Sequence, residues 1–132
     1  MAKKYVGREL HNLTHLISRR VSNAEFMQRA TSVTGTNGWI IGYLAENSDK
    51  DIFQKDLEAQ FSITRSTASK VIKLMEQKGL IKRRGVPQDA RLKKLVLTPK
   101  ATELHKAIKK DIDQLESDLV KGFSPEEIEL FL

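Results

Sequence analysis

The sequence predicts a mainly α-helical fold with one small β-hairpin, and three observations lead to this prediction. Apolar residues recur at steps of three and four along most of the chain, which is the spacing of one helix face. Between residues 80 and 97, two short extended stretches flank a turn rich in Gly, Pro and Asp. Residues 62–100 also carry eleven Lys and Arg against two acidic residues, in a chain of net charge +6. Such a concentration favours a polyanionic partner, although a solvated basic face is the simpler alternative.

The composition limits the class of protein. With 132 residues, 39% of them hydrophobic, the chain can form one domain with a real core but not two full-sized ones. No run of about 18 apolar residues predicts a membrane span, and no apolar segment follows Lys3 and Lys4 as in a secretory signal. The chain has no cysteine, which excludes disulfides, thiolate metal sites and thiol redox switches. We therefore expect a cytoplasmic protein that does not associate with a membrane and has no cofactor.

The N-terminal third predicts two helices. The first covers residues 8–27, and its apolar face is formed by Leu10, Leu13, Ile17, Val21 and Ala24. Residues 31–38 interrupt the pattern with Thr, Ser and two glycines. Thr36 is a candidate N-cap for a second helix over residues 37–46, which carries Trp39, Ile40, Tyr43 and Leu44.

The basic segment predicts a helix-turn-helix. A short helix over residues 52–59 turns Phe53 and Leu57 inward, and residues 61–63 form a tight connection. Thr64 can cap a longer helix over residues 65–78, because its hydroxyl can accept a bond from an N–H of the first turn. Gly79 stands where a left-handed residue ends a helix. Two helices joined by so short a turn form a helix-turn-helix unit.

A hairpin follows directly. Residues 80–84 and 91–97 can pair as strands around the turn at 85–89. Leu95 and Leu97 point to one side of the second strand, and Lys94 and Val96 point to the other. A basic hairpin in this position is called a wing.

The last helix opens at Thr98 and Pro99, because proline suits the first helical position. Its apolar face, close to a heptad seam, consists of Ala101, Leu104, Ile108, Ile112, Leu115 and Leu119. Gly122 ends the helix, and Ser124 begins a capping box before a final apolar turn. The chain stops at Leu132 within this pattern, which predicts a truncated chain or a tail that needs a partner.

The second helix of the helix-turn-helix predicts contacts with double-stranded DNA. The N-terminal part of such a helix enters the major groove. Candidate major-groove residues are Thr64, Arg65, Ser66, Thr67, Ser69 and Lys70. Arg can bind guanine through two parallel hydrogen bonds, and short hydroxyls can bond to base edges or phosphates. Candidate phosphate contacts are Lys73, Lys82, Arg83, Arg84, Lys93 and Lys94. A well-capped surface helix is the alternative interpretation.

The wing predicts a contact with the minor groove. Arg91 can enter a narrow A·T-rich groove, where the negative potential is enhanced. Asp89 can hold the guanidinium in place through a charge-assisted pair. An Asp that merely favours the turn is the alternative.

Residues 56–83 resemble the MarR family of bacterial and archaeal regulators, most specifically in the helix end Lys78-Gly79-Leu80-Ile81. The wing-tip pattern Asp89-x-Arg91 strengthens the resemblance, which extends from about Leu10 to Leu119. It implies a single domain over residues 1–132, with a winged helix-turn-helix lobe at 36–98 and dimerisation helices at 1–30 and 99–132. It further implies a homodimer that reads a pseudo-palindromic operator, and repression as the usual output. The lack of cysteine excludes the peroxide-sensing chemistry of one subgroup.

The resemblance also implies an effector, a small phenolic or aromatic ligand bound between the dimerisation helices and the lobe. Candidate pocket residues are His11, His15, Arg19, Trp39 and Tyr43. Core packing for the aromatic residues and surface positions for the histidines are the alternatives. His11 and His15 are also four residues apart on one helix face, but without nearby Cys or carboxylates the sequence predicts no metal site.

The function expected is therefore sequence-specific binding of double-stranded DNA by a transcriptional repressor that a small molecule relieves. Half-sites should lie about 10 base pairs apart. Non-specific architectural DNA binding and a winged-helix protein-interaction module are the alternatives. An enzyme is not expected, because the sequence has no nucleophile elbow and no Gly-rich phosphate loop.

Overall fold

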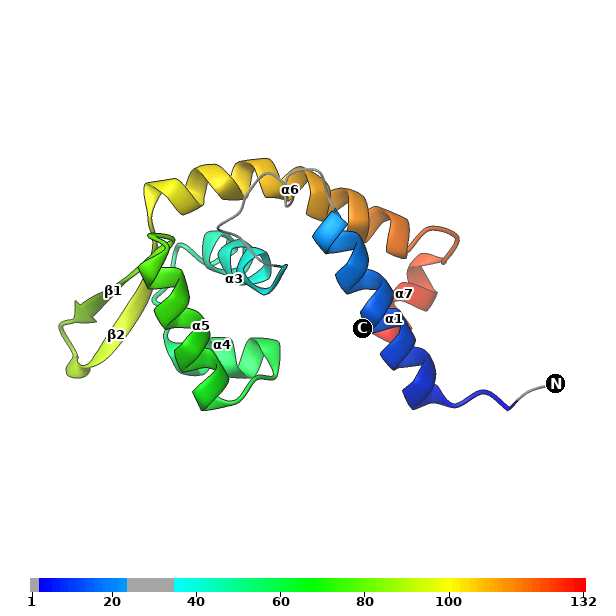
Figure 1. The fold of residues 1–132 in the computed structure, drawn as a ribbon, viewed down its shortest axis with the longest axis horizontal. Coiled ribbons are helices and arrows are strands. Elements are labelled where there is room, and N and C mark those ends of the chain that lie inside the picture. Colours follow the sequence, from blue (N-terminus) through cyan, green and yellow to red (C-terminus); the bar gives the residue numbers. More distant parts are fainter. Residues whose placement is uncertain (1–2, 24–34) are drawn as a thin grey trace.

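The computed structural model describes residues 3–23 and 35–132. Its elements, in chain order, are α1 (Val6–Asn23), α3 (Gly35–Glu46), α4 (Gln54–Phe61), α5 (Arg65–Gln77), β1 (Ile81–Val86), β2 (Asp89–Leu97), α6 (Pro99–Leu119) and α7 (Pro125–Phe131). A lobe of α3, α4, α5 and the hairpin lies at one end of the long helix α6, and α1 and α7 lie near its other end (Figure 1). The predicted fold class, mainly helical with one small hairpin, is confirmed. Within the described ranges, none of the helices combines the length and hydrophobicity needed to cross a bilayer.

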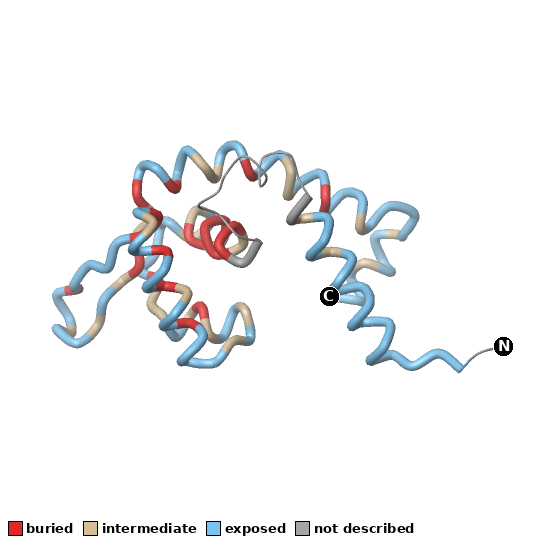
Figure 2. The backbone as a smooth tube through the Cα atoms, viewed as in Figure 1, coloured by how far each residue is buried: buried red, intermediate tan, exposed pale blue. Residues whose placement is uncertain are grey.

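The core lies in the lobe, between α3, α4, α5, the base of the hairpin and the start of α6 (Figure 2). Its largest fully buried side chains are Ile40, Ile41, Leu57, Ile72, Met75, Leu80 and Ile81. These residues come from α3, α4, α5 and β1, with Leu80 in the connection between α5 and β1, so the helix-turn-helix and the wing share one hydrophobic core. Burial of such side chains stabilises each by about 1.5–3 kcal/mol relative to full exposure.

The boundaries of α5 follow the predicted caps. The Thr64 hydroxyl accepts a hydrogen bond from the backbone N–H of Thr67 at 3.2 Å. Gly79 has φ 72°, and the Leu80 N–H donates to the carbonyl of Met75 at 2.9 Å. The chain can therefore leave α5 and enter β1 within three residues.

The start of α3 differs from the prediction. Residues 35–38 are helical, so Thr36 lies inside α3 and does not cap it. The glycines favoured a break on propensity alone, but Asn37 and Gly38 are buried with the apolar face of the helix, and this packing overrides propensity. The predicted break at residues 31–34 and the predicted helical residues 24–27 lie outside the described residues, while α1 begins two residues earlier than predicted, at Val6.

Helix α4 is shifted by two residues from its predicted span. Phe53 is its N-cap, and its backbone N–H donates to the Asp56 carboxylate at 2.8 Å. Phe61 is the last helical residue, and Ser62 ends the helix with φ 51°. The turn to α5 is therefore made by residues 62–64 rather than by residues 61–63.

The wing is longer and its turn tighter than predicted. β1 pairs antiparallel with β2 from Ile81 opposite Leu97 to Val86 opposite Asp89, with an irregularity between Gly85 and Val86. The turn is thus reduced to residues 87 and 88. The Leu95 N–H also donates to the carbonyl of Ile52 at 2.7 Å, which fixes β2 against the segment before α4.

Helix α6 connects the lobe to the rest of the molecule. Ala101, Ile108 and Leu115 are buried at seven-residue intervals, as the predicted seam requires. Gly42 of α3 faces His105 of α6, and a Cβ at position 42 would lie in ordinary contact with Cε1 of His105 at 4.0 Å. Farther along α6, Arg20 of α1 forms an ion pair with Asp118.

Apolar side chains remain exposed on α1 and around α7. On α1 they are Val6, Leu10, Leu13 and Leu16, and near the C-terminus they are Phe123, Leu130, Phe131 and Leu132. No residue of α7 is buried, although its predicted Ser124 capping box is present. Amphipathic helices of this kind gain stability by burying the apolar face against another surface.

Candidate nucleic-acid interface

The outer face of α5 carries the predicted major-groove residues. Ala68, Ile72 and Met75 anchor the inner face in the core. The opposite face is therefore exposed, and it displays Arg65, Ser66, Thr67, Ser69, Lys70 and Lys73. Thr64 has an internal role as well, because its hydroxyl lies 3.2 Å from the Ser66 Oγ and 3.0 Å from the Thr67 Oγ1. This network holds three short hydroxyl side chains together at the helix N-terminus.

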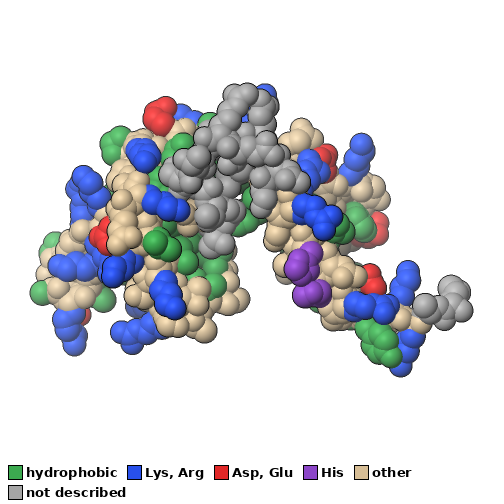
Figure 3. All heavy atoms as spheres, viewed as in Figure 1, with side chains coloured by type: hydrophobic (Ala, Val, Ile, Leu, Met, Phe, Trp, Pro, Cys, Tyr) green, Lys and Arg blue, Asp and Glu red, His purple; other side chains and the backbone are tan. Residues whose placement is uncertain are grey.

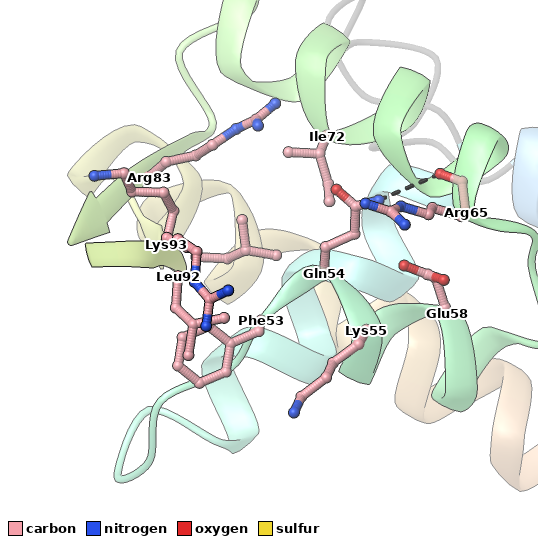
Figure 4. Close-up of a pocket in the computed structure, with 11 residues that line it drawn as sticks. Phe53, Gln54, Lys55, Glu58, Arg65, Ile72, Arg83, Leu92 and Lys93 are labelled. Carbon is pink, nitrogen blue, oxygen red and sulfur yellow. Dashed lines mark hydrogen bonds between the residues drawn. The ribbon is translucent and has the colours of Figure 1, made fainter. Parts of the chain in front are cut away.

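A pocket of about 380 Å³ separates the N-termini of α4 and α5 from the wing (Figure 4). Five cationic residues and one acidic residue, Glu58, line it; the cations are Lys55, Arg65, Arg83, Arg91 and Lys93. Gln54, the first residue of α4, links the two helices, because its side-chain amide donates to the carbonyl of Arg65 at 3.3 Å. A concave surface with this excess of positive charge is suited to a phosphate-bearing strand.

The wing tip contains the predicted pair of Asp89 and Arg91. Nε of Arg91 donates to Oδ1 of Asp89 at 3.2 Å, and a terminal guanidinium nitrogen donates to Oδ2 at 3.2 Å. These bonds, together with one from the Arg91 backbone N–H, hold the pKa of the Asp89 carboxyl below its usual value. The Arg91 side chain remains 90% exposed while paired. A fixed but accessible cation therefore stands at the tip.

The strand register divides the predicted phosphate contacts between two faces of the wing. Arg83 and Lys93 share the face of Leu95, which borders the basic pocket. Lys82, Arg84 and Lys94 lie on the opposite face, where Nζ of Lys94 forms an ion pair with Oδ1 of Asp51 at 3.2 Å. The six predicted cations therefore do not form one surface, because neighbouring strand residues point to opposite faces. Lys73 lies apart from both sets, on the exposed face of α5.

Lys55 and Gln54 belong to the basic pocket but were missed by the sequence analysis. The predicted helix start at residue 52 placed them in the second half of the first turn. With Phe53 as N-cap, they are instead the first two residues of α4. A cation at the start of one helix is weak evidence for a nucleic-acid contact. The structure strengthens this evidence because the N-termini of α4 and α5 meet at the same pocket.

The predicted effector residues are not brought together within one chain. Trp39 and Tyr43 line a pocket of about 290 Å³ between α3, the end of α4 and α6. Phe61 and His105 also line it, and the Phe61 ring meets the Tyr43 ring edge to face at 5.8 Å between centroids. His11, His15 and Arg19 do not line this pocket but lie on the exposed surface of α1.

Comparisons with known proteins point to one family. Residues 31–92 match the family model described as MarR family. The fold matches the crystal structure of the transcription regulator MarR from Oenococcus oeni with a TM-score of 0.87 and 35% identity, covering 96% of this chain and 92% of that one. It also matches MepR of S. aureus in complex with DNA, with a TM-score of 0.82 and 25% identity over 98% of this chain and 91% of that one.

A curated protein of Bacillus subtilis gives a partial match. YdgJ, described as an uncharacterized HTH-type transcriptional regulator, is 28% identical over 82 residues, or 62% of this chain. The match spans half the length of that relative.

Proposed function

The chain belongs to the MarR family of transcription regulators, and from this premise we propose that it is a sequence-specific DNA-binding repressor that acts as a homodimer. A solved relative of 25% identity is a MepR–DNA complex, which supports DNA as the partner. The proposal places the protein with its DNA in the cytoplasm. Repression would follow from occupation of an operator, and a small molecule would relieve it.

The observation that carries the proposal is the basic pocket between the N-terminus of α5 and the wing. Arg65 of the predicted reading helix and Arg91 of the wing tip both line it, and Figure 4 shows Arg65 across the pocket from Arg83 and Lys93 of the wing. In Figure 3, Lys and Arg side chains gather over the hairpin and the helices beside it. A helix in the major groove, a wing tip in the minor groove and phosphates between them would occupy this surface together.

The proposal is tested by selecting duplexes from a random pool with the purified protein. We expect a pseudo-palindrome with half-sites separated by about 10 base pairs, or a multiple of that spacing. Arg65→Ala and Thr67→Ala should then relax or shift base preference at specific positions. Lys73→Ala should weaken binding to all duplexes and lower the salt slope by about one. Lys110→Ala, which removes an exposed lysine of α6, is the matched control and should leave both quantities unchanged.

Two other outcomes would support the alternative functions. Equal affinity for selected and random duplexes at matched salt would indicate an architectural DNA-binding protein. Absence of duplex binding even at low salt would overturn the proposal, and a salt-sensitive complex with an acidic protein would then favour an interaction module. A change of base preference in Lys73→Ala without one in Arg65→Ala would show that α5 is oriented differently from the proposal.

The homodimer is supported by the exposed apolar faces of α1 and α7. Leu10 and Leu13 are 51% and 42% exposed, and Phe131 is 80% exposed. These helices make few contacts within one chain, so burial of their apolar faces against a second copy would stabilise them. Sedimentation equilibrium tests this: Leu13→Glu or Phe131→Glu should shift a dimer towards monomer, while Lys110→Glu should not. A wild-type monomer at micromolar concentration would contradict the proposal.

We assign the effector to the pocket that contains Trp39 and Tyr43. Aromatic walls suit an aromatic ligand. The charged residues of the lining are Glu46, Lys109, Asp113 and Glu116, with Lys109 already bonded to Asp113 at 2.7 Å. The surplus of carboxylates favours a neutral or cationic aromatic ligand over the phenolic anion that the family resemblance implies.

A thermal-shift screen tests this assignment with pairs of aromatic anions and cations of similar size. We expect cations to raise the melting temperature more than their anionic counterparts. Tyr43→Ala should remove the shift, whereas His11→Ala should not. Equal or larger increases in melting temperature with the anions would overturn the proposal that the ligand is neutral or cationic.

A further inference from the structure

Two histidines on the outer surface of α1 direct their ring nitrogens towards each other. Nε2 of His11 and Nε2 of His15 lie 3.1 Å apart, with the ring centroids separated by 4.5 Å in an edge-to-face arrangement. Both residues are exposed, and Figure 3 shows histidine side chains on the surface over this helix. The DNA interface and the pocket between α3 and α6 do not use this pair.

The separation of the two nitrogens fits joint coordination of one metal ion. Metal–imidazole bonds of about 2.0–2.1 Å place two nitrogens about 2.9 Å apart at the right angle of octahedral geometry and about 3.3 Å apart in a tetrahedral site. The observed 3.1 Å lies between these values. We propose that His11 and His15 form a two-histidine chelate for a borderline divalent cation such as Ni²⁺, Zn²⁺ or Cu²⁺.

The sequence alone did not support a metal site here, because spacing of four residues says nothing about side-chain rotamers. The structure shows that the side-chain rotamers bring Nε2 of His11 and Nε2 of His15 together. Coordination requires an unprotonated Nε2 on both rings, so the proton of each neutral imidazole resides on Nδ1. Within the described part of the chain, no cluster of three or more His, Asp or Glu side chains is suited to a metal. Water would fill the remaining coordination positions of a bound ion, and imidazole ligands favour the later transition metals.

The position of the pair on α1 would leave it accessible in the homodimer proposed above. An α-helix has about 3.6 residues per turn, which places His11 and His15 on the side opposite Leu10, Leu13 and Ile17. The apolar side can be covered by a second copy while the histidines still face solvent. On the histidine side, Arg8 is turned away from the pair, because its guanidinium donates to the carbonyl of Lys3 at 3.1 Å and contacts Glu9 at 3.6 Å.

A bound cation would also join two successive turns of a helix that is mostly exposed. A ligand that binds the folded form and not the unfolded form stabilises it by mass action. We therefore expect saturating Zn²⁺ to increase the protection of the α1 backbone amides from hydrogen exchange. The lobe amides should change less.

The composition of the chain makes the binding experiment specific. The sequence has three histidines and no cysteine, so His105 is the matched control. Ni²⁺ is titrated into the full-length protein at pH 7.5 in competition with a chromophoric chelator. We expect one ion per chain. His11→Ala and His15→Ala should each weaken binding about hundredfold, because two linked ligands bind an ion more tightly than one by about this factor. His105→Ala should not change the affinity.

A shifted pair tests the spacing independently. His11→Ala combined with Arg19→His places imidazoles at positions 15 and 19 and should recover most of the lost affinity. His11→Ala combined with Arg19→Ala removes the same positive charge and should not recover it. Wild-type affinity in His11→Ala or His15→Ala, loss of binding in His105→Ala, or failure of the shifted pair to recover affinity would each overturn the proposal. Circular dichroism confirms that the variants remain helical.

Discussion

Replacement of Thr98 by valine should destabilise the junction between the wing, α5 and α6. Thr98 is 7% exposed, and its hydroxyl makes two kinds of bond. It accepts from the backbone N–H of Ala101 at 3.2 Å, and it donates to the carbonyls of Gly79 at 2.6 Å and Leu80 at 3.2 Å. Valine has nearly the same shape but can make neither bond, so the change removes hydrogen bonding without creating a cavity.

The magnitude follows from the lost cap and the lost donor. Loss of an N-cap costs about 1 kcal/mol. The Gly79 carbonyl loses its donor at a residue that is itself exposed, and the Leu80 carbonyl keeps the Thr98 N–H at 3.1 Å, so the cost is at the lower end, about 1 kcal/mol. We expect Thr98→Val to lower the free energy of unfolding by about 2 kcal/mol and the melting temperature by about 6–10 °C.

Urea unfolding at fixed protein concentration measures this effect through the fluorescence of Trp39, the single tryptophan of the chain. The control is Thr102→Val in the same helix. The Thr102 hydroxyl donates at 3.2 Å to the carbonyl of Thr98, which already accepts from the Thr102 N–H at 3.0 Å. Its loss should cost less than about 0.5 kcal/mol. A free energy of unfolding for Thr98→Val within about 0.5 kcal/mol of wild type would refute this reasoning. So would an equal destabilisation of the control, by about 2 kcal/mol.

Three further changes test other features of the structure. The pKa of Asp89 is lower in the folded state than in the unfolded state. The pair with Arg91 therefore stabilises the fold fully above the unfolded pKa near 3.8, and this stabilisation is lost as the pH falls through the lower folded pKa. An NMR titration of Arg91→Ala should therefore show a higher Asp89 pKa, and an unchanged pKa would contradict the pairing. Lys55→Ala should weaken binding to selected and random duplexes alike and reduce the salt slope by about one, as measured by fluorescence anisotropy; altered base preference would show that Lys55 reads bases. Gly79→Ala should cost about 1 kcal/mol in urea unfolding, because φ is 72° and no atom lies within 4 Å of the added Cβ. Gly7→Ala, within a helix and equally free of neighbours, is its control and should not destabilise.

The local signals of helix ends were readable from the sequence. Thr64 and Ser124 cap helices as predicted, α6 opens at the predicted Thr98 and Pro99, and Gly79 takes the left-handed conformation. Each of these features depends on a few consecutive residues, because a cap is a bond between a side chain and the backbone two or three residues later. Such helix ends can be predicted from sequence because their physical cause is equally local.

Segments with weak local preference were predicted less well. Gly35 and Thr36 belong to α3, although glycine and threonine disfavour helix formation. Burial of Ile40, Ile41 and Leu44 against other elements stabilises this helix, and that contribution cannot be read from the segment itself. Helix α4 starts two residues later than predicted for a local reason, because the Phe53 N–H donates to the carboxylate of Asp56 and Phe53 is not among the residues that usually cap helices.

By itself, the sequence determined the order and type of the elements, the concentration of positive charge between residues 62 and 100, and the pairing of Asp89 with Arg91 across two positions. The tertiary structure decided which charges act together. It brought Lys55 and Arg65 to the lining of one pocket, divided the wing cations between two faces and separated Trp39 from His11. The physical reason is that local bonds depend on neighbours in sequence, whereas a surface depends on how helices pack and on the strand register, both of which the shared core fixes.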